Sequence, residues 1–277
     1  MQELISQLER IQVSVAVIGL VLLFLIETGQ PFLKFFTNGF KERAQHSLTN
    51  LALGAINGII NAVLFTALWL WAATWAEQNN FGLLHYLSTL DGFPNWGRII
   101  VAVLIFDFWM YLWHRINHEV PLFWRFHRVH HADAKMDVTT ATRFHFGEII
   151  LSSIIRIPII ILLGLQLWEL LVYGVLVAVV VQFHHANIAL PEWLDKTLRT
   201  FIVTPHIHKV HHSRWQPETD SNYGTIFSFW DRLMRTFRLH NPLHTLELGL
   251  DEFDSDEDKK IKGMLSMPFR KGVKKSK

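Results

Sequence analysis

Histidine residues gather in two short segments of this sequence. One segment, HRINHEVPLFWRFHRVHH, spans residues 114–131, and the other, HIHKVHH, spans residues 206–212. On an α-helix, residues three and four apart share a face, so these spacings direct several imidazoles the same way. Three groups have this spacing: His114 with His118, His127 with His130 and His131, and His208 with His211 and His212. Because imidazole is the commonest side-chain metal ligand and suits iron, zinc and copper, the pattern predicts metal binding.

The number of histidines favours two metal ions. Twelve of the 16 histidines lie between positions 114 and 212, and eight of them belong to the three spaced groups, whereas one ion takes about four to six ligands. The sequence contains no cysteine, so the ligand atoms must be nitrogen or oxygen. We expect interfacial or solvated positions for the isolated histidines His46, His85, His240 and His244, and a position beside the ligands or at the surface for His206.

Long apolar segments must position these imidazoles. Half of the 277 residues are apolar and the mean hydropathy is positive, which is typical of a membrane protein. Segments 11–26, 51–76, 99–113 and 149–183 are long enough, or nearly so, for the roughly 20 helical residues that cross a bilayer core. The first segment lacks a small-residue cleavage site and is expected to be a retained anchor. The last is expected to form a hairpin that turns near residues 164–167. We therefore predict an all-α integral membrane helical bundle of four to five transmembrane helices.

The positions of lysine and arginine predict the orientation of this bundle, because cytoplasmic loops carry the excess of both. Lys34, Lys41 and Arg43 follow the first apolar segment, whereas Arg98 is the single such residue between the second and third segments. Counting spans from there brings both histidine segments to the cytoplasmic face. We expect a multi-pass protein of the cell inner membrane or the endoplasmic reticulum, with a cytoplasmic histidine-rich cap.

Three regions are expected along the chain. Residues 1–98 form N-terminal membrane anchor helices, residues 99–240 a catalytic domain, and residues 241–277 a charged C-terminal tail. The tail from Asp251 onward is expected to be solvated and loosely ordered. Its last four residues, KKSK, either belong to that solvated tail or form an endoplasmic-reticulum retrieval signal. The net charge of +2 gives no field that would attract nucleic acid.

At these histidines the chain resembles the fatty acid hydroxylase and sterol desaturase superfamily of membrane di-iron oxygenases. The segments DFWMYLWHRINH, FWRFHRVHH and PHIHKVHH resemble the three histidine boxes of that family. TATRFHFGE, FHHAN and NYGTIFSFWDRLMRTF are similar to its other characteristic segments, although Phe146 stands where the family usually has proline. The resemblance runs from Asp107 to Phe237, nearly half of the chain.

The resemblance implies ten metal ligands, and the alternative to His145 among them is His184. The ten are His114, His118, His127, His130, His131, His145, His185, His208, His211 and His212. Around the ligands, Asp107 either orients an imidazole or bonds to a neighbouring helix. Glu148 either balances metal charge or caps a helix, and Asn187 is expected to reach a metal through water. Arg156 within an apolar segment lines a substrate channel, binds a lipid headgroup, snorkels or pairs with Glu169.

The resemblance implies an oxidoreductase with two iron ions that hydroxylates or desaturates an unactivated C–H bond of a lipid with O2. We expect no catalytic residue beyond the metal ligands. The sequence contains no cytochrome b5 domain, so the electrons are expected to come from a separate cytochrome b5-like or ferredoxin-like protein. Two alternatives remain: a histidine-rich metal transporter, or a non-catalytic relative with a structural metal. The boxes follow helix ends and no repeat is present, which disfavours the transporter.

Overall fold

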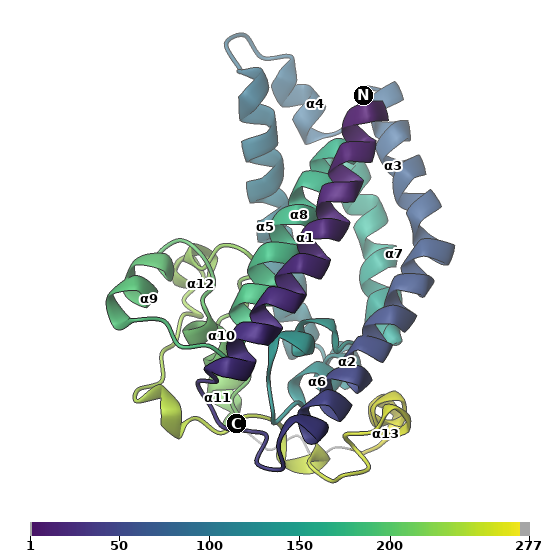
Figure 1. The fold of residues 1–277 in the computed structure, drawn as a ribbon. Helices are drawn as coiled ribbons and strands as arrows, with labels where there is room; N and C mark the ends of the chain where they lie inside the picture. Colours follow the sequence, from purple (N-terminus) through teal and green to yellow (C-terminus); the bar gives the residue numbers. More distant parts are fainter. Residues whose placement is uncertain (1, 272–277) are drawn as a thin grey trace.

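The computed structural model describes residues 2–271, which form a bundle of long helices with a cap at one end (Figure 1). Within these residues, five spans are long and apolar enough to cross a membrane, and the two isolated β-bridges belong to no strand. The predicted all-α membrane bundle is therefore confirmed. The spans comprise α1 (Gln2–Gly29), α2 (Phe40–Ile60) continuing through a π-helical turn (Asn61–Phe65) into α3 (Thr66–Gln78), α5 (Asn95–Glu119), α7 (Phe146–Leu163) and α8 (Leu167–His185).

The predicted hairpin is present as α7 and α8. Gly164 ends α7 with a φ of 68°, and a Cβ there would lie 2.5 Å from the carbonyl oxygen of Phe81, so both backbone and space require glycine. Arg98 of α5 stabilises the turn between α7 and α8, because it pairs with Glu169 at 2.8 Å and donates a hydrogen bond to the Gly164 carbonyl at 2.8 Å. Glu169 is thus not the partner of Arg156, whose guanidinium instead lies 4.7 Å from the ring centre of Trp69.

Successive spans run in opposite directions, so the loop after α1, the segment between α5 and α7, and the chain after α8 meet at one end of the bundle (Figure 1). The hairpin turn and the short helix α4 (Leu83–Ser88) lie at the other end. The cap at the first end contains α6 (Pro121–His131), a 3-10 turn (Val138–Thr142), α9 (Glu192–Leu198), α10 (Pro205–His211), α11 (Gln216–Thr219), α12 (Phe229–Leu233) and α13 (Ile261–Ser266). Every histidine of the two sequence segments therefore lies at the cap end.

The C-terminal segment is part of the cap, which corrects the expectation of a loosely ordered tail from Asp251. Phe253, Met264 and Met267 are buried against Leu53 of α2 and the apolar face of α6. Arg128 of α6 donates to the carbonyls of Met267 and Arg270. Charged residues dominate this segment, but its few apolar side chains supply enough burial to fix it. The KKSK ending lies outside the described residues.

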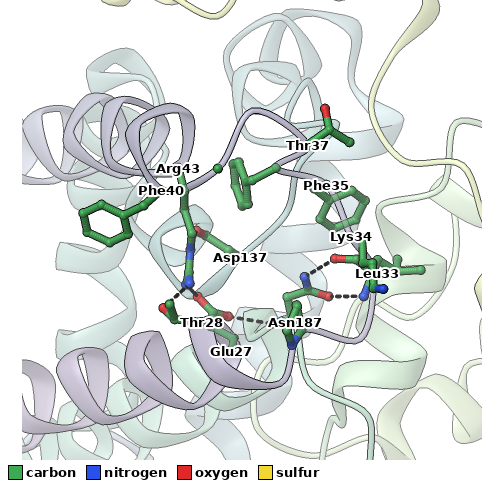
Figure 2. Close-up of a pocket in the computed structure, with 13 residues that line it drawn as sticks. Glu27, Thr28, Leu33, Lys34, Phe35, Thr37, Phe40, Arg43, Asp137 and Asn187 are labelled. Atoms are coloured by element: carbon green, nitrogen blue, oxygen red, sulfur yellow. Dashed lines mark hydrogen bonds and ion pairs between the residues drawn. The ribbon is translucent and has the colours of Figure 1, made fainter.

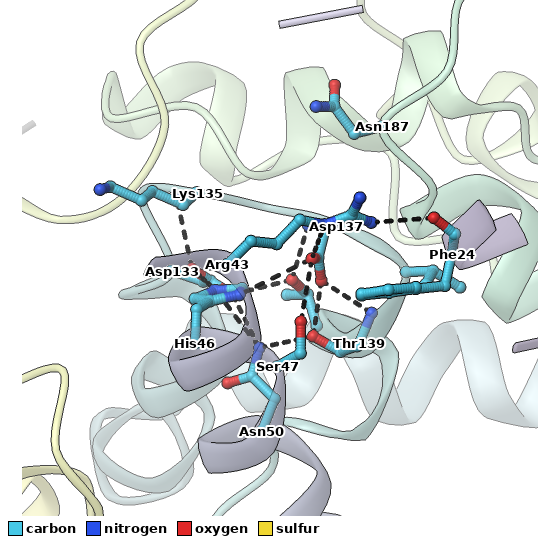
Figure 3. Close-up of polar contacts among 12 residues, drawn as sticks. Phe24, Arg43, His46, Ser47, Asn50, Asp133, Lys135, Asp137, Thr139 and Asn187 are labelled. Carbon is cyan, nitrogen blue, oxygen red and sulfur yellow. Dashed lines mark hydrogen bonds and ion pairs between the residues drawn. The ribbon is translucent and has the colours of Figure 1, made fainter. Parts of the chain in front are cut away.

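Polar side chains of α2 hold the bundle to the chain that follows α6 (Figure 3). His46 Nε2 lies 2.9 Å from a carboxylate oxygen of Asp133, and the amide of Asn50 donates to the Thr139 hydroxyl at 3.1 Å. Burial alone would raise the pKa of Asp133, but the charges of His46 and Arg143, together with hydrogen bonds from His46 and Thr140, lower it well below its usual range. Asp133 therefore stays ionised, and α2 fixes the chain two residues beyond His131. The solvated position expected for His46 is not observed, since its side chain is only 13% exposed, and the interfacial position stays a prediction.

Candidate metal centre

The structure brings nine histidines into two groups at the cap end of the bundle, and within each group the candidate ligand atoms lie within 4.8 Å of one another. The first group contains His114 and His118 from α5, His127 and His131 from α6, and His211 from α10. The second contains His130 from α6, His185 from α8, and His208 and His212 from the α10 region. Nine of the ten residues implied by the resemblance thus lie together, and all of them except the half-buried His114 are buried.

Helix geometry explains how α6 serves both groups. Consecutive residues on a helix are about 100° apart, so His130 and His131 point to different groups although they are neighbours in sequence. Proline opens both α6 and α10, at positions 121 and 205, where its fixed φ starts a helix without losing a hydrogen bond. The two groups adjoin each other, since the rings of His131 and His212 stack with centroids 4.5 Å apart.

Most of these imidazoles accept or donate a hydrogen bond through the ring nitrogen that faces away from the centre of the group, and this contact orients the ring. Such contacts fix which ring nitrogen carries the proton and leave the other nitrogen free to bind a metal. The Nδ1 atoms of four histidines face backbone carbonyls, namely His114 with Tyr223 at 2.9 Å, His130 with Arg143 at 3.3 Å, His185 with Val181 at 2.8 Å and His211 with Ser221 at 2.6 Å. Each Nε2 lone pair is therefore directed into its group.

Carboxylates support two further imidazoles. His127 Nδ1 lies 2.9 Å from Glu148 Oε1, and His118 Nδ1 lies 3.4 Å from Asp220 Oδ1. Glu148 sits in the first turn of α7, where the helix dipole also favours its charge. The side-chain cap of α7 is His145, and Glu148 lies in the first turn beside the histidines. A role of Glu148 in balancing metal charge stays a prediction.

The inward-facing nitrogens fit a metal ion. Four pairs of Nε2 atoms approach within 3.0–3.2 Å, for example His208 with His185 and His114 with His127. Among residues 2–271, His118 Nε2, His211 Nε2 and both ring nitrogens of His212 are buried without a hydrogen-bond partner. Each unsatisfied buried polar atom costs about 1–3 kcal/mol, which metal coordination would offset.

The protonation state of the cap histidines also suits metal binding. Burial, followed by the neighbouring imidazoles, lowers the pKa of His130, His131, His208 and His212 well below the usual value for histidine. Burial lowers the pKa of His211 to about 3. These side chains are consequently neutral at pH 7, and the neutral imidazole is the form that donates a lone pair to a metal.

His145 does not join either group, contrary to expectation. Its Nδ1 accepts a hydrogen bond from the backbone N–H of Gly147 at 2.9 Å, which caps α7, and its Nε2 lies 3.2 Å from the Leu265 carbonyl. The backbone therefore occupies both ring nitrogens. His184, the alternative, is buried beside the second group with its ring centre 3.8 Å from that of His208. Neither of its ring nitrogens has a hydrogen-bond partner in the described part of the chain.

Asp107 contacts no imidazole and joins three parts of the chain instead. Its carboxylate accepts hydrogen bonds from the Tyr173 hydroxyl at 2.8 Å, from the backbone N–H groups of Ile226 and Phe227, and from the Trp230 indole at 3.0 Å. Of the two roles expected for Asp107, bonding to a neighbouring helix is the one observed. The carboxylate also anchors the chain that follows the third histidine box.

Asn187 likewise points away from the histidines, toward a cavity of about 430 Å³ between α1, α2 and the cap (Figure 2). Its side-chain amide donates to the Leu33 carbonyl at 2.8 Å and accepts from the Leu33 N–H at 3.0 Å. Its backbone N–H donates to Glu27, which pairs with Arg43 at 2.5 Å. Asn187 therefore ties the α1–α2 loop to the end of α8, which corrects the expected water-mediated role at a metal.

Several residues that shape the site were missed in the sequence. The carbonyls behind the imidazoles carry no side-chain signal, so they could not be found. Asp220 and Asp133 could have drawn notice, because each is an acidic residue within nine positions of a histidine box. The buried pair of Glu27 and Arg43 had a signal as well, since Glu27 directly follows the apolar segment 11–26 and Arg43 precedes the segment 51–76 by eight residues.

Comparison with known proteins places this geometry in a family. The sequence model of the fatty acid hydroxylase family matches residues 99–236. An ornithine lipid hydroxylase of Rhizobium tropici is 33% identical over 153 residues, which cover 55% of this chain and 44% of that protein. The human alkylglycerol monooxygenase is 29% identical over 147 residues, covering 50% of this chain and 30% of that protein. A cholesterol 25-hydroxylase-like protein of Danio rerio is 28% identical over 142 residues, which cover 50% of this chain and 54% of that protein.

The matched region contains both histidine groups. The chain spans less than two thirds of the length of each of these relatives. No solved structure matches the chain significantly. The family match and the similarity to several lipid hydroxylases agree with the histidine boxes, and this chain belongs to the fatty acid hydroxylase and sterol desaturase superfamily.

Proposed function

We propose that this protein hydroxylates an unactivated C–H bond of a membrane lipid, using O2 and a centre of two iron ions. The observation that carries the proposal is the convergence of nine histidines into two adjoining groups at the end of a membrane bundle. The names of the relatives support hydroxylation in preference to desaturation, because the three described above are hydroxylases or a monooxygenase. Their substrates are lipids, which suits a site at the end of apolar helices.

Each histidine group would hold one ion. The five histidines of the first group and the four of the second supply nine ligands, and His184 is the tenth by its position beside His208. When bound, iron supplies the redox chemistry that activates dioxygen for C–H oxidation. The protein contributes ligand geometry, orientation and the exclusion of water.

The residues around the histidine groups supply this orientation and exclude water. Glu148 and the four backbone carbonyls hold the imidazoles in one tautomer and orientation. The apolar core of α5, α7 and α8 contains Phe106, Ile160 and Val180, and Val180 precedes His185 of the second group by five residues of α8. Such side chains keep water from the reacting C–H bond and fit the acyl or ring part of a lipid.

The orientation and the partners are also part of the proposal. The excess of lysine and arginine near the α1–α2 loop supports a cytoplasmic cap, in the cell inner membrane or the endoplasmic reticulum. Residues 1–98 would anchor the protein, residues 99–240 would carry the reaction, and residues 241–271 would complete the cap. The electrons would come from a separate cytochrome b5-like or ferredoxin-like protein.

An isotope experiment tests the reaction. The purified protein is supplied with iron, an electron donor, 18O2 and lipid extracts containing fatty acids, sterols, ether lipids, carotenoids or ornithine lipids, and the products are identified by mass. We expect one labelled oxygen atom in the product. A product that has lost two hydrogens without gaining label would show desaturation.

Variants of single histidines connect that reaction to the metal groups. His130→Ala and His211→Ala each remove one candidate ligand and should abolish product formation, whereas His244→Ala changes an exposed histidine outside both groups and should not. No labelled product from any lipid class, with two irons bound and the donor shown to reduce them, would contradict the proposal. Loss of the folded protein in both ligand variants would favour a structural metal instead.

A further inference from the structure

A lobe of the cap exposes large apolar side chains. The lobe consists of residues 192–202, which include α9, and residues 226–233, which include α12. Trp193, Phe201 and Leu233 are 69%, 63% and 67% exposed. The two segments are joined to each other, because Ile202 pairs with Phe227 in a β-bridge and Ser228 N–H donates to the Phe201 carbonyl at 3.1 Å.

The lobe reaches far along the side of α5. Asp107 accepts hydrogen bonds from Ile226, Phe227 and Trp230, so these residues lie at the level of Asp107. His114, which belongs to the first histidine group, follows Asp107 by seven residues, a distance of about 10 Å along a helix. The lobe therefore extends about 10 Å from the level of the histidines toward the middle of the spans.

The ends of the spans indicate where the bilayer boundary lies. The candidate spans α7 and α8 have their cap ends at Phe146 and His185, and His185 belongs to the second histidine group. The histidines thus lie near the boundary, and the lobe lies on the bilayer side of it. Figure 1 shows the same arrangement, with α9 and α12 beside the lower halves of α5 and α8, and α10 and α11 nearer the cap end.

The charged groups of the lobe are arranged as expected at a membrane–water interface. Arg199 pairs with the buried Asp195 at 2.7 Å, and Lys196 pairs with Glu192 at 2.7 Å. The Arg232 guanidinium lies 3.9 Å from the ring centre of Phe237 and donates to the Arg199 carbonyl at 2.8 Å. Long cationic side chains of this kind keep their charge near lipid headgroups while their stems contact apolar surface.

We propose that the α9–α12 lobe is inserted into the acyl-chain layer of the leaflet on the side of the histidine groups. Its occupant is therefore lipid, and Phe201 and Leu233 contact acyl chains directly. The lobe continues the lipid-facing surface of the spans, because it is hydrogen-bonded to α5 at the level of Asp107. A large exposed apolar patch on a soluble cap would otherwise face water at a cost in free energy.

The natural absence of cysteine allows a direct test. Single-cysteine variants Phe201→Cys and Leu233→Cys are spin-labelled and reconstituted in phosphatidylcholine vesicles. Collision rates are measured with O2, which concentrates among acyl chains, and with a water-soluble nickel chelate. Val63→Cys, at a 73% exposed span position, is the acyl-chain control, and Asp256→Cys, with a side chain 97% exposed in the C-terminal segment, is the water control.

We expect both lobe labels to give an O2-to-nickel collision ratio several-fold above that of Asp256→Cys and closer to that of Val63→Cys. A collision ratio closer to that of Asp256→Cys at either position overturns the proposal. The apolar side chains of the lobe would then be covered by a protein partner and not by lipid. Each variant must retain wild-type helical content, and Trp193→Cys replaces either one that does not. The readout requires no turnover, so it is independent of the proposed hydroxylase activity.

Discussion

The hydrogen bond between Glu148 and His127 gives a quantitative test of the metal centre. The Glu148 Oε1 atom lies 2.9 Å from His127 Nδ1, and the two side chains are 8% and 3% exposed. Solvent screens so buried a contact weakly. Carboxylates in this position behind a metal-binding imidazole contribute about 10- to 100-fold in metal affinity, which equals about 1.4–2.8 kcal/mol. We therefore expect Glu148→Ala to weaken metal binding by that factor.

The assay is a competitive metal titration against a chelator of known affinity, with Glu119→Ala as the matched control. Glu119 also follows a candidate ligand closely, but its side chain is 54% exposed and pairs with Arg115 at the surface, so its loss should change affinity little. Glu148→Gln keeps an acceptor for the imidazole and should fall between wild type and Glu148→Ala. The oxygen Oε2 of Glu148 has no hydrogen-bond partner within residues 2–271, so Glu148→Ala should remain folded. An unchanged affinity in folded Glu148→Ala would refute the reasoning.

Three further predictions concern the surroundings of the histidines. His145→Ala should retain wild-type metal content after a chelator challenge and should lower the free energy of unfolding by about 1 kcal/mol through loss of a helix cap. His184→Ala should lose metal from the second group under the same challenge. Metal loss in His145→Ala but not in His184→Ala, measured by elemental analysis, would identify His145 as the ligand. Asp107→Ala leaves four donors without their acceptor, two of them buried and two partly buried. It should lower the free energy of unfolding by about 3 kcal/mol or more, visible as a lower melting temperature than that of Asp256→Ala. Burial lowers the pKa of His211 to about 3, below the roughly 6.5 of an unfolded histidine. Between these two pH values the unfolded chain binds more protons than the folded chain, so the metal-free protein should melt at a lower temperature at pH 5.5 than at pH 7.5. An equal or higher melting temperature at pH 5.5 would show that the histidine groups are protonated without a cost in stability.

The span pattern was predictable because it depends on composition and on a few backbone-breaking residues. Apolar length identified the five spans, and Gly164 marked the hairpin turn by its requirement for a positive φ. The orientation across the membrane was predicted from the charges and stays a prediction. Spacing of four identified histidines that share a group, namely His114 with His118, His127 with His131, and His208 with His212. The pairs spaced by three, His127 with His130 and His208 with His211, are divided between the two groups, so that part of the prediction was wrong.

The errors at the site have a common physical origin. His145 resembles a ligand in sequence, but a histidine just before a helix is equally able to cap it, and only the position of the Gly147 N–H decides between the two. Asn187 lies near histidines along the chain, yet it bonds to backbone groups of the distant α1–α2 loop. For Asp107, a bond to a neighbouring helix was one of the two expected roles and is the one observed. The C-terminal segment was misjudged because charge dominated its composition, whereas Met264 and Met267 determined its packing.

The number of metal ions bound per chain tests the central claim most directly. The protein is purified anaerobically with iron supplied, and all metals are quantified by elemental analysis together with the protein concentration. Two adjoining histidine groups predict two ions per chain. They predict one ion for the double variant His185→Ala with His208→Ala, because it removes two of the four histidines of the second group and none of the first. Zinc in place of iron would be consistent with two sites, because it generally binds such ligands more tightly than ferrous iron. One ion or none in the folded wild-type protein would contradict the account.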